Sequence, residues 1–306
     1  MGTTVPASVA ETERLLGEQA YFADHGLSVA VFLALSLKRP LLIEGEAGVG
    51  KTEIAKALAT GLGRKLIRLQ CHEGLDVFSA AYEWNHLRQM LELRLSEAAG
   101  EPRSRDTLTA DIFAPRFLIK RPLLQALEPQ PEGPPVLLID EIDRADAPFE
   151  AFLLEILSEF QMTVPELGTL RADVPPVVIV TSNRTREIHD ALKRRCLYHW
   201  LNYPDAERET RILLRRAPAV NEEFAGQIVA YVQGLRARDL FKPPGIAETI
   251  DWAHAILALG HHALNDELLA DTLGVLLKYE EDLAVVRRGL GEDLSTVPAK
   301  PRSMSR

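Results

Sequence analysis

The segment at residues 40–52, which reads PLLIEGEAGVGKT, constrains this 306-residue chain more than any other. A short apolar run over residues 41–43 predicts a buried strand, and the run stops at a glycine-rich turn. Ile54, Leu58 and Leu62 then recur at helical spacing, so the segment predicts a strand, a loop and a helix in that order. An ordinary glycine-rich turn before a helix is the alternative, and the complete context disfavours it.

The loop fits the pattern GxxxxGK[ST], which binds the phosphates of a nucleoside triphosphate. Glycines let backbone N–H groups wrap the phosphates, and the following helix adds the partial positive charge of its N-terminus. Lys51 can reach the outer phosphates, and the Thr52 hydroxyl can bind Mg²⁺. The predicted phosphate-binding residues of this loop are Gly45, Glu46, Ala47, Gly48, Val49, Gly50, Lys51 and Thr52.

Polar residues follow two further apolar runs. The run VLLID ends in Asp140 and is followed by Glu141, and the run VVIVT stops shortly before Asn183. Ligands of an open parallel sheet bind at the carboxyl ends of its strands, so we expect these side chains to lie close together. Asp140 would then bind the nucleotide and hold Mg²⁺ together with Thr52. Glu141 would polarise the attacking water, and Asn183 would align that water or donate to a phosphate oxygen.

Each of these residues also has a plainer explanation. An acid pair at the end of a strand can cap a helix, and Asn183 can be a turn residue. The phosphate-binding loop upstream favours the catalytic interpretation of Asp140 and Glu141. Arg194 and Arg195 end the next predicted helix, where cations favour the C-terminus through the macrodipole. A P-loop ATPase can instead use such an arginine on a neighbouring subunit's γ-phosphate, and spacing alone leaves both roles open.

Alternating strands and helices, followed by helices only, predict an α/β domain with a parallel sheet and a separate small all-α domain. Trp84, Leu87, Leu91 and Leu95 mark an amphipathic helix in a segment inserted between the second and third strands. Residues 161–172 are typical of a small hairpin. The expected divisions are a flexible lead-in over residues 1–20, the α/β domain over 21–203, the all-α domain over 204–290 and a disordered tail over 291–306.

Composition narrows the class of protein. The net charge of −9 argues against a broadly basic nucleic-acid surface, so no nucleic-acid partner is expected. Cys71 and Cys196 lie in no CxxC pattern, which favours small buried hydrophobic residues over a zinc site or a disulfide. The N-terminus has no apolar signal core, and the longest apolar stretch, residues 27–37, is too short to span a bilayer. We therefore expect a cytoplasmic location.

The phrases GEAGVGKT, LLIDEIDRA, VIVTSN and DALKRRC, in that order and followed by helices, resemble the MoxR branch of the AAA+ ATPases. Longer phrases such as FEAFLLEILSEF and PGIAETIDWA look closest to its CoxD-like group. The resemblance covers about residues 20–285, and residues 137–200 carry most of its specificity. It implies a P-loop AAA+ domain with a five-stranded parallel sheet core and a small α-helical lid domain.

The family also implies ATP and Mg²⁺ as cofactors and a ring of subunits, usually a hexamer, that works as a remodelling chaperone. MoxR proteins typically act with a partner that carries a von Willebrand factor A domain. CoxD-like members are linked to maturation of the molybdenum- and copper-containing active site of carbon monoxide dehydrogenase, so a client metalloenzyme is expected. A helix-2 insert would lie within about residues 82–117, and a presensor-1 hairpin would correspond to residues 161–172.

The family's functional residues transfer position by position. Lys51 and Thr52 match Walker A, Asp140 and Glu141 match Walker B, Asn183 matches sensor 1, and Arg195 matches the arginine finger, with Arg194 as the alternative. One position departs from the pattern: Ala247 stands near the place where the family commonly has a sensor-2 arginine. The lid would then use another cation or sense the nucleotide less directly.

The function expected from the sequence is ATP hydrolysis coupled to remodelling or maturation of a client metalloenzyme. A nucleic-acid motor or loader is one alternative, which the acidic charge balance disfavours. A nucleotide-switched binding module that hydrolyses ATP slowly is another.

Overall fold

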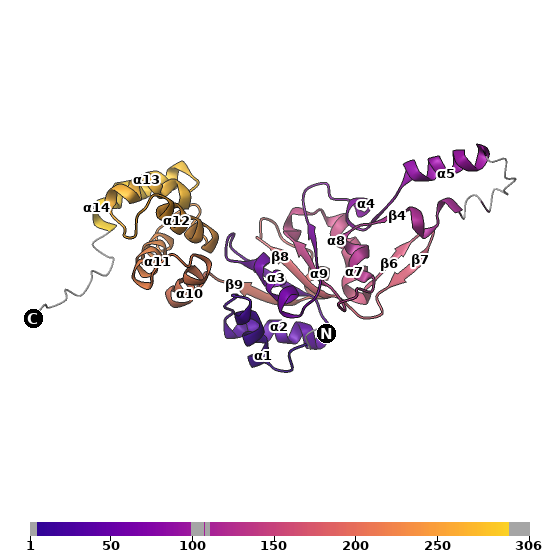
Figure 1. Cartoon of the computed structure of the whole chain (residues 1–306), viewed down its shortest axis with the longest axis horizontal. Helices are drawn as coiled ribbons and strands as arrows, with labels where there is room; N and C mark the ends of the chain where they lie inside the picture. Colours follow the sequence, from indigo (N-terminus) through magenta and orange to yellow (C-terminus); the bar gives the residue numbers. More distant parts are fainter. Residues whose placement is uncertain (1–4, 99–106, 108–110, 294–306) are drawn as a thin grey trace, which may run out of the picture. The chain divides into compact units, whose positions relative to one another are not determined.

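The computed structural model describes residues 5–98, 107 and 111–293. The chain divides into two compact units. The first, the α/β unit, comprises the N-terminal stretch to Gln19, Ala23–Glu44 and Thr52–Trp200. The second, the helical unit, comprises Ala20–Phe22, Gly45–Lys51 and the chain from Leu201 onward. Figure 1 traces the order of their elements, and the expected boundary after residue 203 stays a prediction.

A five-stranded sheet forms the core of the α/β unit, which confirms the predicted fold class. The strand order is β2-β5-β8-β1-β9, and neighbours such as β5 and β8 run parallel, with Leu138 opposite Ile179. β1 and β5 each begin with a continuous apolar run, because both strands are buried along their whole length. The strands are β1 (Leu41–Gly45), β2 (Leu66–Gln70), β5 (Val136–Asp140), β8 (Val177–Ser182) and β9 (Leu197–Leu201).

Helices pack their apolar faces into the same core. In α8, Phe149, Leu153 and Ile156 are buried and recur at helical spacing. Asp146 begins this helix by accepting a hydrogen bond from the Phe149 N–H at 2.9 Å. The helices along this part of the chain are α1 (Val9–Glu18), α2 (His25–Leu37), α3 (Lys51–Gly61), α4 (Val77–Ala80), α7 (Pro122–Leu127), the 3₁₀ turn η2 (Ile142–Arg144), α8 (Ala147–Glu159) and α9 (Asp190–Lys193).

The inserted segment differs from the expected amphipathic helix. Trp84 is buried in a strand, because β3 (Tyr82–Trp84) pairs antiparallel with β4 (Leu118–Lys120). A helix, α5 (His86–Ala98), does follow, and Leu87, Leu91 and Leu95 lie on it, but their side chains are exposed rather than packed in a core. The 3₁₀ turn η1 (Pro115–Phe117) leads into β4. The expected hairpin is present as β6 (Gln161–Val164) and β7 (Gly168–Arg171).

Two further expectations need correction. The flexible lead-in over residues 1–20 is a helix, α1, from residue 9 to residue 18; residues 1–4 lie outside the described part. The Ser8 hydroxyl caps this helix, and Leu15 and Leu16 are buried, so packing orders the segment. The helix expected to end at Arg194 and Arg195 ends earlier, because α9 spans only Asp190–Lys193.

The helical unit has its own core around Trp252 and Phe224, with the apolar faces of its helices turned inward. Its helices are α10 (Ala206–Arg216), α11 (Glu222–Arg236), α12 (Ile246–Ala258), α13 (Asp266–Leu276) and α14 (Glu280–Asp293). The tail expected to be disordered from residue 291 is still helical to Asp293, and residues 294–306 lie outside the described part. Within residues 5–98, 107 and 111–293, no helix combines the length and apolar content that a membrane crossing requires.

Candidate active site

Residues 45–51 of the predicted phosphate-binding loop belong to the helical unit. Gly48 and Gly50 have φ angles of +78° and +97°, which L side chains rarely adopt, so the loop needs glycine there. A Cβ on Gly48 would also lie 3.1 Å from the Cα of Gly245, and the Ile246 N–H donates to the Gly48 carbonyl at 3.0 Å. The start of α12 therefore holds the loop by backbone contact.

Lys51 is almost fully buried, with 6% of its surface exposed. Its ammonium group donates to the carbonyl oxygens of Gly45 and Glu46, each at 2.6 Å, while the Glu46 side chain is exposed and Val49 is buried. The cation therefore lies inside the curve of the loop, where phosphate oxygens would be its ligands. Lys51 also begins α3, whose next residue, Thr52, belongs to the α/β unit.

Asp140, at the end of β5, gathers several partners in the α/β unit. Its Oδ1 accepts hydrogen bonds from the hydroxyls of Thr52 at 2.9 Å and Thr181 at 2.5 Å. Its Oδ2 accepts from the Arg68 guanidinium at 2.6 Å. A hydroxyl beside a carboxylate offers the hard oxygen ligands that Mg²⁺ prefers, so the residues fit that ion. Among the described residues, no three His, Cys, Asp or Glu side chains gather to hold a metal.

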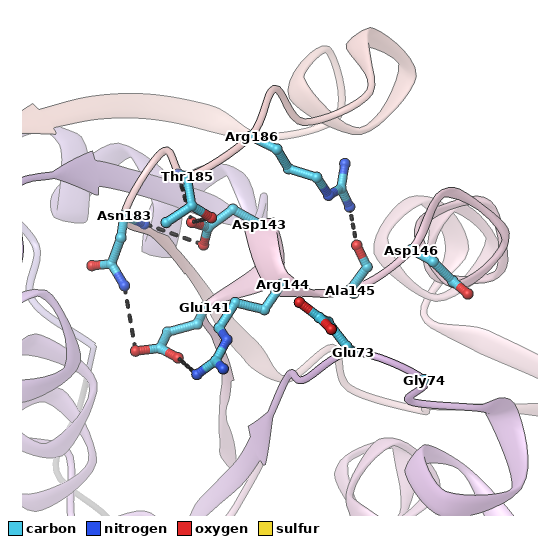
Figure 2. Close-up of a pocket in the computed structure, with 10 residues that line it drawn as sticks. All are labelled: Glu73, Gly74, Glu141, Asp143, Arg144, Ala145, Asp146, Asn183, Thr185 and Arg186. Carbon is cyan, nitrogen blue, oxygen red and sulfur yellow. Dashed lines mark hydrogen bonds and ion pairs between the residues drawn. The ribbon is translucent and has the colours of Figure 1, made fainter.

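Glu141 has a φ of +56°, an uncommon backbone conformation for a residue other than glycine. Its N–H donates to the Thr181 hydroxyl at 3.0 Å, so one hydroxyl contacts both acids. The Glu141 carboxylate accepts from Asn183 Nδ2 at 3.3 Å, Gln70 Nε2 at 3.0 Å and Arg144 Nη1 at 3.2 Å. Figure 2 shows the Asn183 amide and the Arg144 guanidinium meeting this carboxylate from two sides.

The structure adds a residue that the sequence interpretation missed, Asp143. Its carboxylate is buried, with 2% of the residue exposed, and it accepts from the Asn183 N–H at 3.2 Å. It also accepts from the N–H and the hydroxyl of Thr185, at 2.9 and 2.7 Å. These bonds, seen in Figure 2, tie the loop after β8 to η2 and so fix the backbone of Asn183. The sequence DEID, in which a third acid follows Asp140 and Glu141, could have indicated this residue.

An open pocket of about 710 Å³ adjoins these residues in the α/β unit. Its wall includes Glu141 and Asn183, so both side chains face solvent-accessible space where a water could approach the carboxylate. Figure 2 shows the residues that line it: Glu73, Gly74, Glu141, Asp143, Arg144, Ala145, Asp146, Asn183, Thr185 and Arg186.

Cys71 lies directly after β2, and its N–H donates to the Asp140 carbonyl at 2.9 Å. Burial, and then the charge of Asp140, raise the pKa of its thiol to about 12. Burial likewise raises the pKa of the Cys196 thiol to about 12. Both thiols therefore stay protonated at neutral pH and are buried hydrophobic groups, as the sequence predicts.

Arg194 and Arg195 are exposed on the α/β unit. Arg195 donates from Nε to the Ser158 hydroxyl and from Nη1 to the Ala191 carbonyl at 2.9 Å, and the Arg194 carbonyl accepts from Arg39 Nη2 at 3.0 Å. These contacts hold the Arg195 side chain beside α8 and α9, and they are separate from the hydrogen bonds that hold Asp140 and Glu141. The structure thus brings Thr52, Asp140, Glu141 and Asn183 together and leaves both arginines on the surface.

Ala247 stands near the place where the resemblance to MoxR proteins leads us to expect a sensor-2 arginine. Ala247 is exposed in the first turn of α12, and the following residue, Glu248, accepts from the Gly245 N–H at 3.0 Å. Glu248 therefore caps this helix with a carboxylate.

Solved structures of Thermotoga maritima RuvB are similar to the chain. A point mutant of that protein is 18% identical, with 92% of this chain and 76% of that chain covered and a TM-score of 0.49. For the structure described as the Thermotoga maritima RuvB Holliday junction branch migration motor, the identity is 18%, the coverage is 91% and 75%, and the TM-score is 0.45.

A family model described as "AAA domain (dynein-related subfamily)" matches residues 40–196. This match takes in just over half of the chain, from the residue before β1 to Cys196, shortly after the end of α9. It includes Lys51, Asp140 and Asn183. The chain therefore belongs to the AAA domain family, dynein-related subfamily.

Proposed function

We propose that this protein binds ATP with Mg²⁺ and hydrolyses it at the ends of β5 and β8. The observation that carries the proposal is the bonded cluster of Thr52, Asp140, Glu141 and Asn183, which comes from segments far apart in the sequence. Phosphoryl transfer needs mainly positioning and neutralisation of charge. A pre-arranged hydroxyl, two acids and an amide meet that need. Membership of the AAA domain family supports the same chemistry.

Each residue has a distinct role in this proposal. Residues 45–52 wrap the phosphates with backbone N–H groups, and the Lys51 ammonium turns from the loop carbonyls to the outer phosphates. Thr52 and Asp140 hold Mg²⁺, which supplies charge neutralisation at the phosphate oxygens when bound. Glu141 accepts a proton from the attacking water, and Asn183 keeps that carboxylate in place from 3.3 Å away.

The exposure of Arg194 and Arg195 supports a role in another subunit's site. We propose that the protein forms a homo-oligomer, a hexamer by resemblance to MoxR proteins. Arg195 would then stabilise the transferring phosphate of the neighbour, with Arg194 as the alternative, an effect worth roughly 10³ to 10⁵ in rate where it operates.

Two substitutions test the site itself. Lys51→Ala should weaken ATP binding by more than about tenfold, because the phosphates lose their buried cation. Glu141→Gln should keep ATP binding and lower kcat by about 10³, because the amide cannot accept the proton. ATP affinity by calorimetry and phosphate release measure the two effects. Glu155→Gln, the same change on α8 outside the cluster, should match the wild type. Hydrolysis that survives Glu141→Gln would refute the proposal.

Mixing variants tests catalysis across subunits. Arg195→Ala should still bind ATP but lose oligomer-dependent turnover. Combined with Glu141→Gln protein, it should regain part of the activity, because some interfaces then pair an intact Glu141 with an intact Arg195. No recovery in mixtures that demonstrably co-assemble would count against action in trans.

We further propose that hydrolysis drives remodelling or maturation of a client metalloenzyme in the cytoplasm, together with a partner that carries a von Willebrand factor A domain. The resemblance to the CoxD-like group supports carbon monoxide dehydrogenase, with its molybdenum–copper site, as the client. A pull-down with Glu141→Gln, which should retain ATP and bound client, tests this. If Glu141→Gln still activates the captured client, the protein acts as a nucleotide-switched binding module instead.

A further inference from the structure

The edge strand β2 directs a cation at Asp140. Arg68 donates to Asp140 Oδ2 from Nη2 at 2.6 Å and from Nε at 3.1 Å. The two side chains differ in burial, because Asp140 is 3% exposed and Arg68 is 49% exposed. β2 is the last strand on its side of the sheet. The guanidinium therefore reaches a buried carboxylate from a position open to solvent.

The two oxygens of Asp140 have different partners. Oδ1 accepts from the hydroxyls of Thr52 and Thr181, while Oδ2 accepts from Arg68. A buried carboxylate needs a compensating positive charge, and Arg68 supplies it. Mg²⁺ bound with ATP would supply a positive charge to the same carboxylate. Two cations at one carboxylate repel each other, so the ion and the guanidinium are alternatives.

We propose that Arg68 competes with Mg²⁺ for Asp140, and that binding of Mg²⁺ with ATP displaces the guanidinium into solvent at the sheet edge. The inference rests on the ATP-binding function proposed above. Half-exposure gives Arg68 room to move, because its head group needs no repacking of the core to leave.

The competition extends to the second acid through Gln70. Arg68 also donates to the Gln70 side-chain oxygen, and Gln70 Nε2 donates to Glu141 Oε2 at 3.0 Å. Arg68 and Gln70 are alternate residues on one face of β2. Displacement of Arg68 therefore removes one bond that orients the Gln70 amide against Glu141. Binding of Mg²⁺ at Asp140 and the positioning of Glu141 are therefore linked through β2.

The test is the Mg²⁺ dependence of nucleotide binding. All variants carry Glu141→Gln, so that a fluorescent ATP analogue is not consumed while Mg²⁺ is titrated. Arg68→Gln removes the charge and keeps a polar side chain, and the Mg²⁺ concentration at half-maximal binding should fall about tenfold. Arg68→Lys keeps a charge without the two-point contact, and its Mg²⁺ midpoint should lie between those of the parent and Arg68→Gln.

A second readout is stability without nucleotide. Arg68→Gln should unfold at a lower temperature than its parent, since the buried Asp140 carboxylate loses the guanidinium bonded to it, and Mg²⁺ with the analogue should remove most of that difference. Arg121→Gln is the matched control. Arg121 Nη2 also lies 2.6 Å from a carboxylate, Glu83, and its side chain is 42% exposed, but the pair is outside the site. Its Mg²⁺ midpoint should equal that of the parent.

The outcomes separate the two proposals. If the parent binds the analogue and Arg68→Gln leaves the midpoint unchanged or raises it, Arg68 does not compete with the metal and the inference is wrong. If Arg68→Gln does not fold, an unchanged or raised midpoint for Arg68→Lys has the same meaning. If the parent protein binds no analogue at any Mg²⁺ concentration, the proposed function itself is wrong.

Discussion

Replacing Asp143 should reveal how the loop after β8 is held. Asp143→Ala removes an acceptor from the N–H groups of Asn183 and Thr185 and from the Thr185 hydroxyl. A buried donor left without a partner costs about 1–3 kcal/mol. Asn183 is half-buried and Thr185 is exposed, so water can replace part of the loss. We therefore expect the free energy of unfolding to fall by about 2 kcal/mol.

The same substitution should affect catalysis more than binding. The Asn183 amide lies 3.3 Å from Glu141 because its backbone is tied to Asp143. Once that tie is lost, a misplacement on the order of 1 Å would lower kcat by up to about 10²-fold. ATP affinity should change little, since the bonds that Asp143 accepts come from Asn183 and Thr185 on the loop after β8.

Urea denaturation and steady-state ATPase rates measure these two effects. Asp143→Asn keeps the shape and one acceptor oxygen, so its losses should be intermediate. Asp146→Ala is the matched control, because this aspartate caps a single N–H, that of Phe149. It should lose about 1 kcal/mol of stability and keep the kcat of the wild type. The reasoning is refuted if Asp143→Ala loses no more stability than Asp146→Ala, or if its kcat is normal.

Two further predictions concern protonation and a buried ion pair. Since the folded Cys71 thiol has a pKa raised to about 12 from 9.0, the unfolded chain loses this proton first as pH rises, and stability falls from about pH 9 towards 12. Between about pH 9 and 12, Cys71→Ala should make the free energy of unfolding, measured in urea, less dependent on pH than in the wild type. Equal pH dependence in the two proteins would contradict this. In the helical unit, Arg236 donates to Glu209 at 2.6 and 2.7 Å, with side chains 7% and 1% exposed. Arg236→Met should lower the free energy of unfolding by about 3–5 kcal/mol, because the Glu209 carboxylate loses its cation. The double variant Arg236→Met with Glu209→Gln should recover much of that loss. Equal losses in the two variants would refute the explanation.

The sheet and the four clustered residues, Thr52, Asp140, Glu141 and Asn183, could be predicted from the sequence because both depend on local patterns. Runs of four apolar residues, within strands of five and six residues, mark strands that are buried on both faces, and each run ends where the chain turns towards the site. The rule that ligands bind at the carboxyl ends of parallel strands then places Asp140 beside Asn183 without any knowledge of strand order.

The partners of these residues could not be predicted in the same way. Arg68 lies 72 residues from Asp140, and nothing around it distinguishes a counter-ion from a solvated arginine at a strand edge. The same holds for the pairing of Trp84 with Leu118, which turned an expected helical residue into a strand residue. α5 shows a further limit, because a correct apolar spacing predicted a buried face and the structure leaves Leu87 exposed. Periodicity identifies the apolar side of a helix but does not supply the surface that would cover it.

The arrangement of the two acids links these observations. Thr181 donates to Asp140 and accepts from the Glu141 N–H, so a single hydroxyl on β8 fixes the distance between the proposed metal ligand and the proposed base. On the opposite side, Arg68 and Gln70 contact the same two acids from β2. Binding of Mg²⁺ with ATP would displace Arg68 on β2 but leave the Thr181 bonds intact, because Thr181 is buried. In this scheme the contacts from β8 to the two acids stay the same when Mg²⁺ binds, and the contacts from β2 change. For this reason we expect substitutions on β2 to alter metal dependence, and substitutions that loosen the end of β8 to alter the rate of hydrolysis.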